Sequence, residues 1–366
     1  MSEIEFTHLQ DLINSQSLIK RDYDLHGLIK LRIVSAKRKF IDFFEKEYSF
    51  FSSTEESDPD IELIHCNVEL NSRIDFLKFL GKDYSFNNFI TIISGIRARY
   101  FLLKKRVKEI AMAGLIGKKL MIFCREDMLP EYIQSCVIEP LFRIYFNLQG
   151  YELIHSSCVS DGDKGYLFPA WRNTGKTSII LHLCLNENLN FISDDWTVLS
   201  KKGELLAYPK PVQIFEYNLR EYPNLLHKFF SSRLKRLIFK GKLKISSRKV
   251  KIGAISENIS TSCNLHTVIM PIRWSKNQIK VSRNVNQIEL AQKIVACANY
   301  EHYSFYRHLY SSNFQLKIPY EEFVNLLQSQ VEIVRKAIQN SICHEIYIPK
   351  TISFTRIIDV IKDLIK

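Results

Sequence analysis

The segment of residues 151–195 constrains the fold more than any other part of the chain, because apolar runs, a loop and a helical pattern follow one another there in a fixed order. Two predicted strands, "YELIHSSCV" and "YLFPA", flank the turn "SDGDKG". The loop "WRNTGK" comes next, followed by the helix "TSIILHLCLNE" and the strand "LNFISDD". Strand, loop, helix and strand is the order that a phosphate-binding unit of an α/β protein requires.

The loop itself nearly matches the phosphate-loop pattern, which is Gly, four residues, and then Gly-Lys-Ser/Thr. The chain reads "LFPAWRNTGKTSII", with Ala170 where the first glycine is expected. Backbone N–H groups of such a loop converge on phosphates, the lysine adds a positive charge, and the hydroxyl ligates Mg²⁺. The alternative is a chance Gly-Lys-Thr in a lysine-rich chain. The residues predicted to contact a nucleotide are Asn173, Thr174, Gly175, Lys176, Thr177 and Ser178.

Two acidic residues and one histidine are predicted to lie near this loop. Asp194 and Asp195 end the next strand, at the sheet edge where ligands bind in open α/β sheets. His155 lies in the strand before the loop, 21 residues ahead of Lys176. The alternatives are a helix cap or turn for the aspartates and a hydrogen-bonded core residue for the histidine.

These pieces together resemble the HPr kinase/phosphorylase superfamily, which shares its nucleotide core with phosphoenolpyruvate carboxykinase. In that family Leu-His-x-Ser/Thr precedes a Gly-x-Ser-Gly-x-Gly-Lys-Ser/Thr loop, and a strand ending in Asp-Asp follows. This chain has "IHSS" at 154–157, "NTGKT" at 173–177 and "SDD" at 193–195. The resemblance in motifs covers about residues 150–212, and a weaker one in element order runs from about residue 62 to the end.

The resemblance implies an ATP- and Mg²⁺-dependent kinase. It implies that Lys176 binds the β- and γ-phosphates and that Thr177 and Asp195 hold Mg²⁺. Asp194 would act as the base toward an acceptor hydroxyl, which His155 would orient or polarise.

Departures from the family pattern narrow the expected substrate. The Glu-x-Arg-Gly-type signature that supports phosphorolysis is absent, which argues against HPr as the substrate and against the reverse reaction. The preferred acceptor is a serine of a peptide or protein. The alternatives are a small metabolite or saccharide hydroxyl, an RNA-directed kinase, and a nucleotide-sensing module that transfers no phosphate.

Positive charge is concentrated in one segment. The chain has a formal net charge of +12, and residues 220–251 alone hold eleven Lys/Arg and one Glu. The part "KGKLKISSRKVKIG" alternates basic and apolar residues, which predicts a ribbon with one charged face. We expect this basic segment to face an acidic peptide substrate; a lid over ATP, a nucleic-acid surface and a solvated insertion are the alternatives.

Composition predicts a globular cytoplasmic protein. Of its 366 residues 46% are hydrophobic and 25% charged, and no apolar run is long enough to span a bilayer. The first residues, "MSEIEFTHLQ", are polar and acidic, unlike a secretory signal. The eight cysteines are scattered and are expected to be reduced core residues, and "CHE" at 343–345 is a weak metal-site pattern.

The predicted fold class is α/β: a mixed sheet with a P-loop kinase core of the HPr kinase/carboxykinase type, and a strand and helix that return to it at the C-terminus. Residues 1–60 are predicted as a helical N-terminal extension and linker, because "LHGLIKLRIVSAKRKFIDFFEKEY" has apolar residues at three-to-four spacing. Residues 61–366 are predicted as one nucleotide-binding domain. Trp171 and Arg172 in the loop are expected either to contact a nucleotide or to pack against the N-terminal region.

Overall fold

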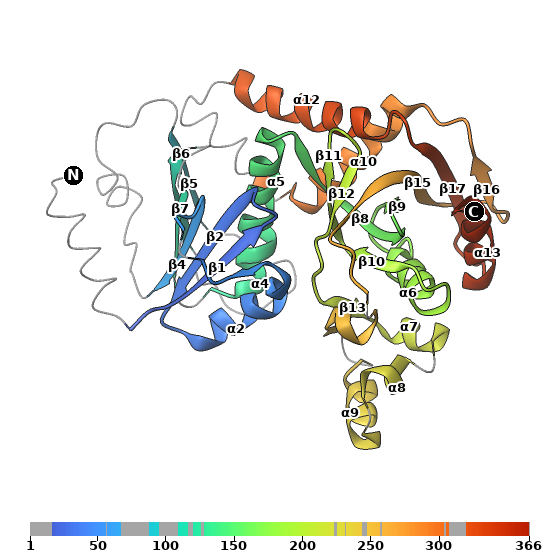
Figure 1. The fold of residues 1–366 in the computed structure, drawn as a ribbon, viewed down its shortest axis with the longest axis horizontal. Helices are drawn as coiled ribbons and strands as arrows, with labels where there is room; N and C mark the ends of the chain where they lie inside the picture. Colours follow the sequence, from blue (N-terminus) through green and yellow to red (C-terminus); the bar gives the residue numbers. More distant parts are fainter. Residues whose placement is uncertain are drawn as a thin grey trace, which may run out of the picture. The chain divides into compact units, whose positions relative to one another are not determined.

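The protein is a mixed α/β protein, as the sequence predicts, and its chain forms two compact units (Figure 1). The computed structural model describes residues 17–55, 57–66, 88–94, 109–115, 120–125, 128–222, 225–230, 232–243, 247–256, 258–303, 305–306 and 320–365. One unit contains Met1–Gln149 with His302–Leu326, and the other Gly150–Glu301 with Leu327–Lys366. The expected boundary at residue 60 is therefore wrong, because the segment after it shares a sheet with the strands before it.

The first unit is built on a sheet with the strand order β3-β1-β2-β4-β7-β6-β5. β2 pairs with β4 and β4 with β7 in parallel, and the other neighbours are antiparallel. The strands are β1 (Ile19–Leu25), β2 (Ile29–Ser35), β3 (Ser52–Ser53), β4 (Ile61–Cys66), β5 (Asn88–Ser94), β6 (Glu109–Leu115) and β7 (Leu120–Arg125).

The N-terminal segment corrects the predicted helical extension. β1 and β2 form an antiparallel hairpin, and only α2 (Arg38–Glu47) is helical as predicted, followed by a short 3₁₀ turn at Ser49–Phe51. Leu25, Ile29, Leu31 and Ile33 are all buried, and three of them recur every second residue, which places them on one face of the hairpin. Residues 1–16 of the expected extension lie outside the described residues.

A helix that precedes the second unit is also more buried than the sequence suggests. It comprises α4 (Pro130–Ile133), a π-helical turn at Gln134–Ile138, and α5 (Glu139–Leu148). All but the last residue of α5 are buried, so this is a core helix. It ends at Leu148, close to Gly150.

The second unit is built around an eight-stranded mixed sheet. The order is β10-β8-β11-β12-β15-β17-β16, and β9 pairs with both β8 and β15. These strands are β8 (Tyr151–Asp161), β9 (Lys164–Pro169), β10 (Asn190–Ser193), β11 (Trp196–Ser200), β12 (Glu204–Leu206), β15 (Ser262–Trp274), β16 (Lys280–Ser282) and β17 (Ile342–Pro349). β11 and β12 form a hairpin that turns across Lys202 and Gly203.

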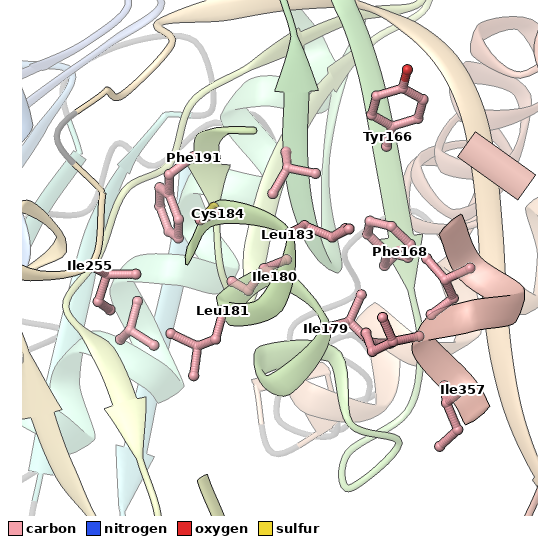
Figure 2. Close-up of a cluster of buried hydrophobic side chains, with 14 of the residues drawn as sticks. Tyr166, Phe168, Ile179, Ile180, Leu181, Leu183, Cys184, Phe191, Ile255 and Ile357 are labelled. Carbon is pink, nitrogen blue, oxygen red and sulfur yellow. The ribbon is translucent and has the colours of Figure 1, made fainter. Parts of the chain in front are cut away.

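Helices cover both faces of this sheet. On one face α6 (Lys176–Asn186) and α13 (Phe354–Ile365) pack on one apolar cluster, and on the other α10 (Gln287–Glu301) and the end of α12 (Tyr320–Ala337) pack on a second. Alternate strand residues divide between the two: in β9 Phe168 faces α6 while Leu167 faces α10. Figure 2 shows the first cluster, with Ile179 and Leu183 of α6 near Phe168. The result is a three-layer unit whose central strands are buried on both sides.

The basic segment is helical over much of its length, which corrects the predicted ribbon at residues 240–243 only. Arg248–Val250 of that ribbon do form a paired strand, and residues 244–246 lie outside the described residues. After β13 (Val212–Ile214) come α7 (Glu216–Glu221), α8 (Leu225–Phe229) and α9 (Arg233–Leu243), and then β14 (Arg248–Val250), which pairs with β13, and a 3₁₀ turn at Ile252–Ala254. Phe239 of α9 packs on Phe229 and Phe230, with ring centroids 6.4 and 4.9 Å apart. These aromatic contacts stabilise α9, whose last residues, 240–243, belong to the predicted ribbon.

Candidate functional site

The predicted phosphate loop connects β9 to α6, as the sequence indicates. Pro169 still pairs with Ser156 of β8, and the Ala170 N–H donates to the His155 carbonyl over 3.3 Å. Ala170 is fully buried, so this position belongs to the strand end. The loop therefore leaves the sheet after Ala170, where alanine fits without strain.

The end of the loop needs a glycine. Gly175 precedes the first residue of α6 with φ of +98°, in the left-handed region, and Asn173 also has a positive φ of +60°. A side chain at position 175 would be strained whatever the surrounding space, because L residues rarely adopt this conformation. Because of this turn, the start of α6 faces the loop. The first N–H groups of a helix have no hydrogen-bond partner within the helix, and they carry partial positive charge.

Lys176 lies inside the loop and not in solvent. Its Nζ donates to the carbonyls of Ala170 over 2.9 Å and Trp171 over 3.2 Å. Burial lowers the pKa of Lys176, whereas the charges of Asp195, Asp194 and Glu301 raise it. The lysine is thus a nearly buried cation that closes the loop on itself.

Asp194 is the acidic residue that meets the start of α6. It is 4% exposed, and its carboxylate accepts hydrogen bonds from Ser157 Oγ over 2.6 Å and from Thr177 Oγ1 over 3.0 Å. Burial, and then the charge of Asp195, raise the pKa of Asp194 to about 6, against the opposing effect of these hydrogen bonds and of Lys176. The Thr177 hydroxyl therefore contacts Asp194, and the roles of Thr177 and Asp195 in holding Mg²⁺ stay a prediction.

Asp194 and Asp195 occupy a break between two strands that pair with the same neighbour. Ser193 of β10 pairs with Cys158 of β8, and Trp196 of β11 pairs with His155. Asp195 turns the chain there, with φ of +71°, and its carbonyl accepts a hydrogen bond from the Ser156 N–H over 3.1 Å. Since the two strands continue along β8, the aspartates are held against the residues that follow His155.

His155 is buried at the same place. It is 5% exposed, and its ring centroid lies 5.4 Å from that of Trp196. Burial lowers its pKa well below the usual value, and the positive charges of Lys176 and Arg172 lower it further. The sequence predicts His155 near the loop and the aspartates, and the structure brings the three together.

Glu301 joins the site, although the sequence does not indicate it. It is the last residue of α10, and its side chain is only 5% exposed. Oε2 forms an ion pair with Arg172 of the loop, and Oε1 lies 3.9 Å from His155 Nδ1. No local pattern marks this glutamate, because 124 residues separate it from Thr177. The one signal in the sequence is a glutamate at the end of a largely apolar helical run, and it does not indicate which residues the carboxylate contacts.

The same helix end provides an exposed aromatic contact to the loop. Trp171 and Tyr300 meet edge to face, with ring centroids 5.3 Å apart, and both remain substantially exposed. Trp171 and Arg172 thus contact α10 through neighbouring residues. The loop is fastened to the helix by one aromatic pair and one ion pair.

The remaining predicted contact residues divide into two groups. Thr174 is buried, and its hydroxyl donates to the Trp171 carbonyl over 2.9 Å, while Asn173 is exposed at the loop tip. Ser178 is buried and accepts a hydrogen bond from Asn218 of α7 over 2.9 Å. Its hydroxyl therefore faces α7, and its backbone N–H is the group of Ser178 that lies on the loop side of the helix.

The weak metal pattern at 343–345 has a structural explanation. Glu345 of β17 accepts hydrogen bonds from Lys293 over 2.8 Å and from the Tyr347 hydroxyl over 2.6 Å. In the part of the chain that the structure describes, no group of three or more His, Cys, Asp and Glu side chains is arranged to hold a metal. Seven of the eight cysteines have described side chains, and these are unpaired thiols, six of them buried.

Fold and site together define a mixed α/β protein in which a lysine-bearing loop links a strand to a helix beside a buried acidic pair. The chain matches no model of a known protein family, and a search of curated protein sequences finds no match either. None of the helices in the described ranges has both the length and the apolar character needed to cross a membrane.

Proposed function

We propose that this protein is an ATP- and Mg²⁺-dependent phosphotransferase that uses a P-loop kinase core of the HPr kinase type and acts on a hydroxyl group. The observation that carries the proposal is the contact between Thr177 Oγ1 and the buried Asp194 carboxylate, directly after the loop that holds Lys176. A hydroxyl, a carboxylate and a lysine in this arrangement are the groups that nucleotide-dependent phosphoryl transfer requires.

The side chains suit a hard cation. Thr177 and Asp194 offer oxygen ligands, which Mg²⁺ prefers. Asp194 is also buried beside a second carboxylate, Asp195, and a bound cation would offset the unfavourable free energy of burying this negative charge. Thr177 and Asp194 would hold the ion, with Asp195 as the neighbouring carboxylate. A bound Mg²⁺ neutralises the charge that develops on the phosphates during transfer.

Lysine and loop would bind the triphosphate. Lys176 would exchange its two carbonyl contacts in the loop for phosphate oxygens, which are stronger partners for an ammonium group. The N–H groups at the start of α6 would supply the remaining contacts. Arg172, with its side chain 63% exposed, places a second cation at the same loop.

The preferred acceptor is a serine of a peptide or protein. The support is the resemblance of the motifs to peptide-directed kinases of the superfamily, together with the basic segment 220–251 in the same unit. Its exposed Arg233, Lys235, Lys240 and Lys242 would attract an acidic peptide. A metabolite or saccharide hydroxyl is the alternative acceptor.

Calorimetry with Mg-ATP on the Lys176→Ala variant tests this proposal. We expect binding to become undetectable, because the loop loses its internal cation. Asp194→Asn should still bind ATP but should need more Mg²⁺ for the same affinity, since one ionised ligand is removed. Asp195→Asn should change the Mg²⁺ requirement less, because its carboxylate does not contact Thr177.

Lys202→Ala in the exposed turn of the β11–β12 hairpin is the matched control, and its affinity should equal that of the parent. If Lys176→Ala binds Mg-ATP as tightly as the parent, the loop is not a phosphate site. If the parent binds Mg-ATP but transfers labelled γ-phosphate to no peptide, metabolite or RNA pool, the protein is a nucleotide sensor and not a kinase.

A further inference from the structure

Helix α9 has one face that packs on its own unit. The Phe239 ring lies against Phe229 and Phe230, and Phe229 and Phe239 also pack against the apolar cluster of α6 and α13. The Arg236 guanidinium donates to the Phe230 carbonyl over 2.9 Å. Figure 1 shows α9 next to α8, to which these contacts join it. They hold α9 so that its other face is presented to the surroundings.

The other face of α9 carries exposed aliphatic side chains. Leu237 is 59% exposed and Ile238 is 49% exposed. Successive helical residues are about 100° apart, so the exposed Gly241, one turn after Leu237, lies between the two around the helix. A Cβ added at Gly241 would meet nothing within 4 Å among the described residues, which leaves room for a partner to approach closely. We call these three residues the apolar seam.

Basic residues follow both sides of the apolar seam. Around the helix, Arg233 and Lys240 lie on one side of it, and Lys235 and Lys242 lie on the other. All four are exposed, and no Asp or Glu occurs from residue 222 to residue 256 to neutralise them. An apolar seam between two rows of like charge is the arrangement with which one helix of a coiled coil selects a partner of opposite charge.

We propose that this face of α9 is the docking surface for an acidic amphipathic helix of the peptide or protein substrate, an inference that rests on the proposed function. Apolar side chains of the substrate helix would cover Leu237 and Ile238, and its Asp and Glu side chains would pair with the flanking cations. α9 and the phosphate loop belong to the same unit. A docked helix therefore raises the effective concentration of an attached serine at the loop.

Other occupants fit this face less well. A second copy of α9 would bring rows of like charge together. Single-stranded RNA is usually bound by basic residues with exposed aromatic rings, whereas the aromatic residue of α9, Phe239, packs inward. An anionic bilayer would gain little, because affinity for it scales with the apolar area inserted and two aliphatic side chains insert little.

Fluorescence anisotropy with two labelled peptides tests the inference on the full-length protein without ATP. Both peptides contain a serine and about four helical turns with Glu on the flanks. One has Leu at the i, i+3, i+4 and i+7 positions of its apolar face, and the other has Gln there, so their charges are equal. We expect the parent to bind the Leu peptide about 10- to 100-fold more tightly than the Gln peptide.

The decisive variant is Leu237→Gln/Ile238→Gln, which keeps every charge of the helix. It should bind both peptides with about the affinity that the parent has for the Gln peptide, since the apolar contact is lost on either side of the pair. The matched control is Ile288→Gln at the start of α10, where the side chain is 55% exposed, and it should bind like the parent.

Three outcomes would overturn the inference. The first is an equal affinity of the parent for the two peptides, which needs no variant and so does not depend on how the variant folds. The second is a double variant that still prefers the Leu peptide as the parent does. The third is binding of the parent to phosphatidylserine vesicles, or dimerisation of the parent, that the double variant loses while its affinity for the Leu peptide is unchanged.

The docking inference and the proposed function can fail separately. Lys176→Ala should lose Mg-ATP binding but bind the Leu peptide like the parent. With labelled Mg-ATP, the parent should phosphorylate the Leu peptide at a lower KM than the Gln peptide and with a similar kcat. Selective binding of the Leu peptide without any transfer to it would overturn the kinase proposal and the role of the docked helix as substrate. Transfer to both peptides with equal kcat/KM would overturn the docking inference alone.

Discussion

His155 makes the stability of the protein sensitive to mild acid. Its pKa is lowered well below the usual value because the ring is buried, and because Lys176 and Arg172 are positively charged. Below about pH 6.5 the unfolded chain protonates this histidine and the folded chain does not, so the contribution of the neutral ring to the free energy of unfolding falls as the pH falls. This contribution is complete above that pH and is lost progressively below it.

We therefore predict that His155→Gln flattens this dependence. Between pH 7 and pH 5.5 the parent should lose about 1 kcal/mol more of its free energy of unfolding than the variant does. Urea denaturation across this range measures it, in magnesium-free buffer. Substitution of the exposed His227 by Gln is the control and should follow the parent. Parallel pH profiles for the parent and His155→Gln would show that the ring is protonated in the folded protein.

The sequence predicts most of this site where neighbours in the chain are also neighbours in space. Gly175, Lys176 and Thr177 follow one another at a helix start, so their spacing alone indicates the loop. The sequence does not predict Glu301, because helix α10 brings it to the loop and no local spacing indicates that contact. It also does not predict which aspartate contacts Thr177, since this depends on the left-handed backbone at Asp195.

At the scale of elements, strand β9 depends on one small residue. A Cβ added at Gly165 would lie 2.5 Å from Leu205 Cδ1, 2.7 Å from Cys263 Sγ and 3.0 Å from the carbonyl oxygen of Asn264. Leu205 can move aside, but the Asn264 carbonyl belongs to β15, which pairs with β9. Gly165→Ala would therefore force apart two strands of the sheet that carries the loop.

We predict that Gly165→Ala lowers the free energy of unfolding by about 1–3 kcal/mol, the usual cost of overpacking. Gly253→Ala is the matched control, because a Cβ there meets nothing within 4 Å, and it should leave stability nearly unchanged. Denaturant titration of both variants measures the difference. Equal midpoints for the two would mean that β9 and β15 separate without cost.

The elements predicted from sequence were most accurate where chain pattern and burial agree. The strand–loop–helix order of 151–186 is confirmed because the buried strands and helix contain continuous apolar runs. The pattern failed in two mixed segments. Residues 19–35 carry charges on alternate positions of a hairpin, and residues 240–243, predicted as part of a ribbon, end a helix. In both, contacts with the neighbouring element accompany the structure that forms: β1 with β2, and Phe239 with Phe229 and Phe230.

At the scale of the whole molecule, positive charge is concentrated in the basic segment 220–251. α9 carries Arg233, Lys235, Lys240 and Lys242 on its exposed surface, where Leu237 and Ile238 are exposed as well. Reversal of these four basic residues to Glu lowers the net charge of +12 by two per substitution. We predict that this variant binds an acidic serine peptide more weakly but binds Mg-ATP as the parent does.

Salt titration separates the possible partners of this segment. An acidic peptide neutralises few charges, so its affinity should fall gently as salt rises. Single-stranded RNA held through several phosphates should lose affinity with a slope near −0.7 per contact on a double-logarithmic plot. Fluorescence anisotropy with both labelled probes measures the two slopes. Unchanged peptide affinity in the charge-reversed variant would leave the segment as a solvated insertion, and an effect on Mg-ATP alone would make it a lid.

The break between β10 and β11 also sets the number of residues that can separate these two strands. Ser193 and Trp196 pair with Cys158 and His155 of one continuous strand, so the two residues between them match two residues of β8. Removal or insertion of one residue would shift β11 by one position along β8, and each side chain from Trp196 to Ser200 would change faces. Substitutions at 194 and 195 therefore test chemistry, whereas insertions and deletions would rearrange the core. The spacing from Ser193 to Trp196 is therefore fixed by the pairing of both residues with one strand.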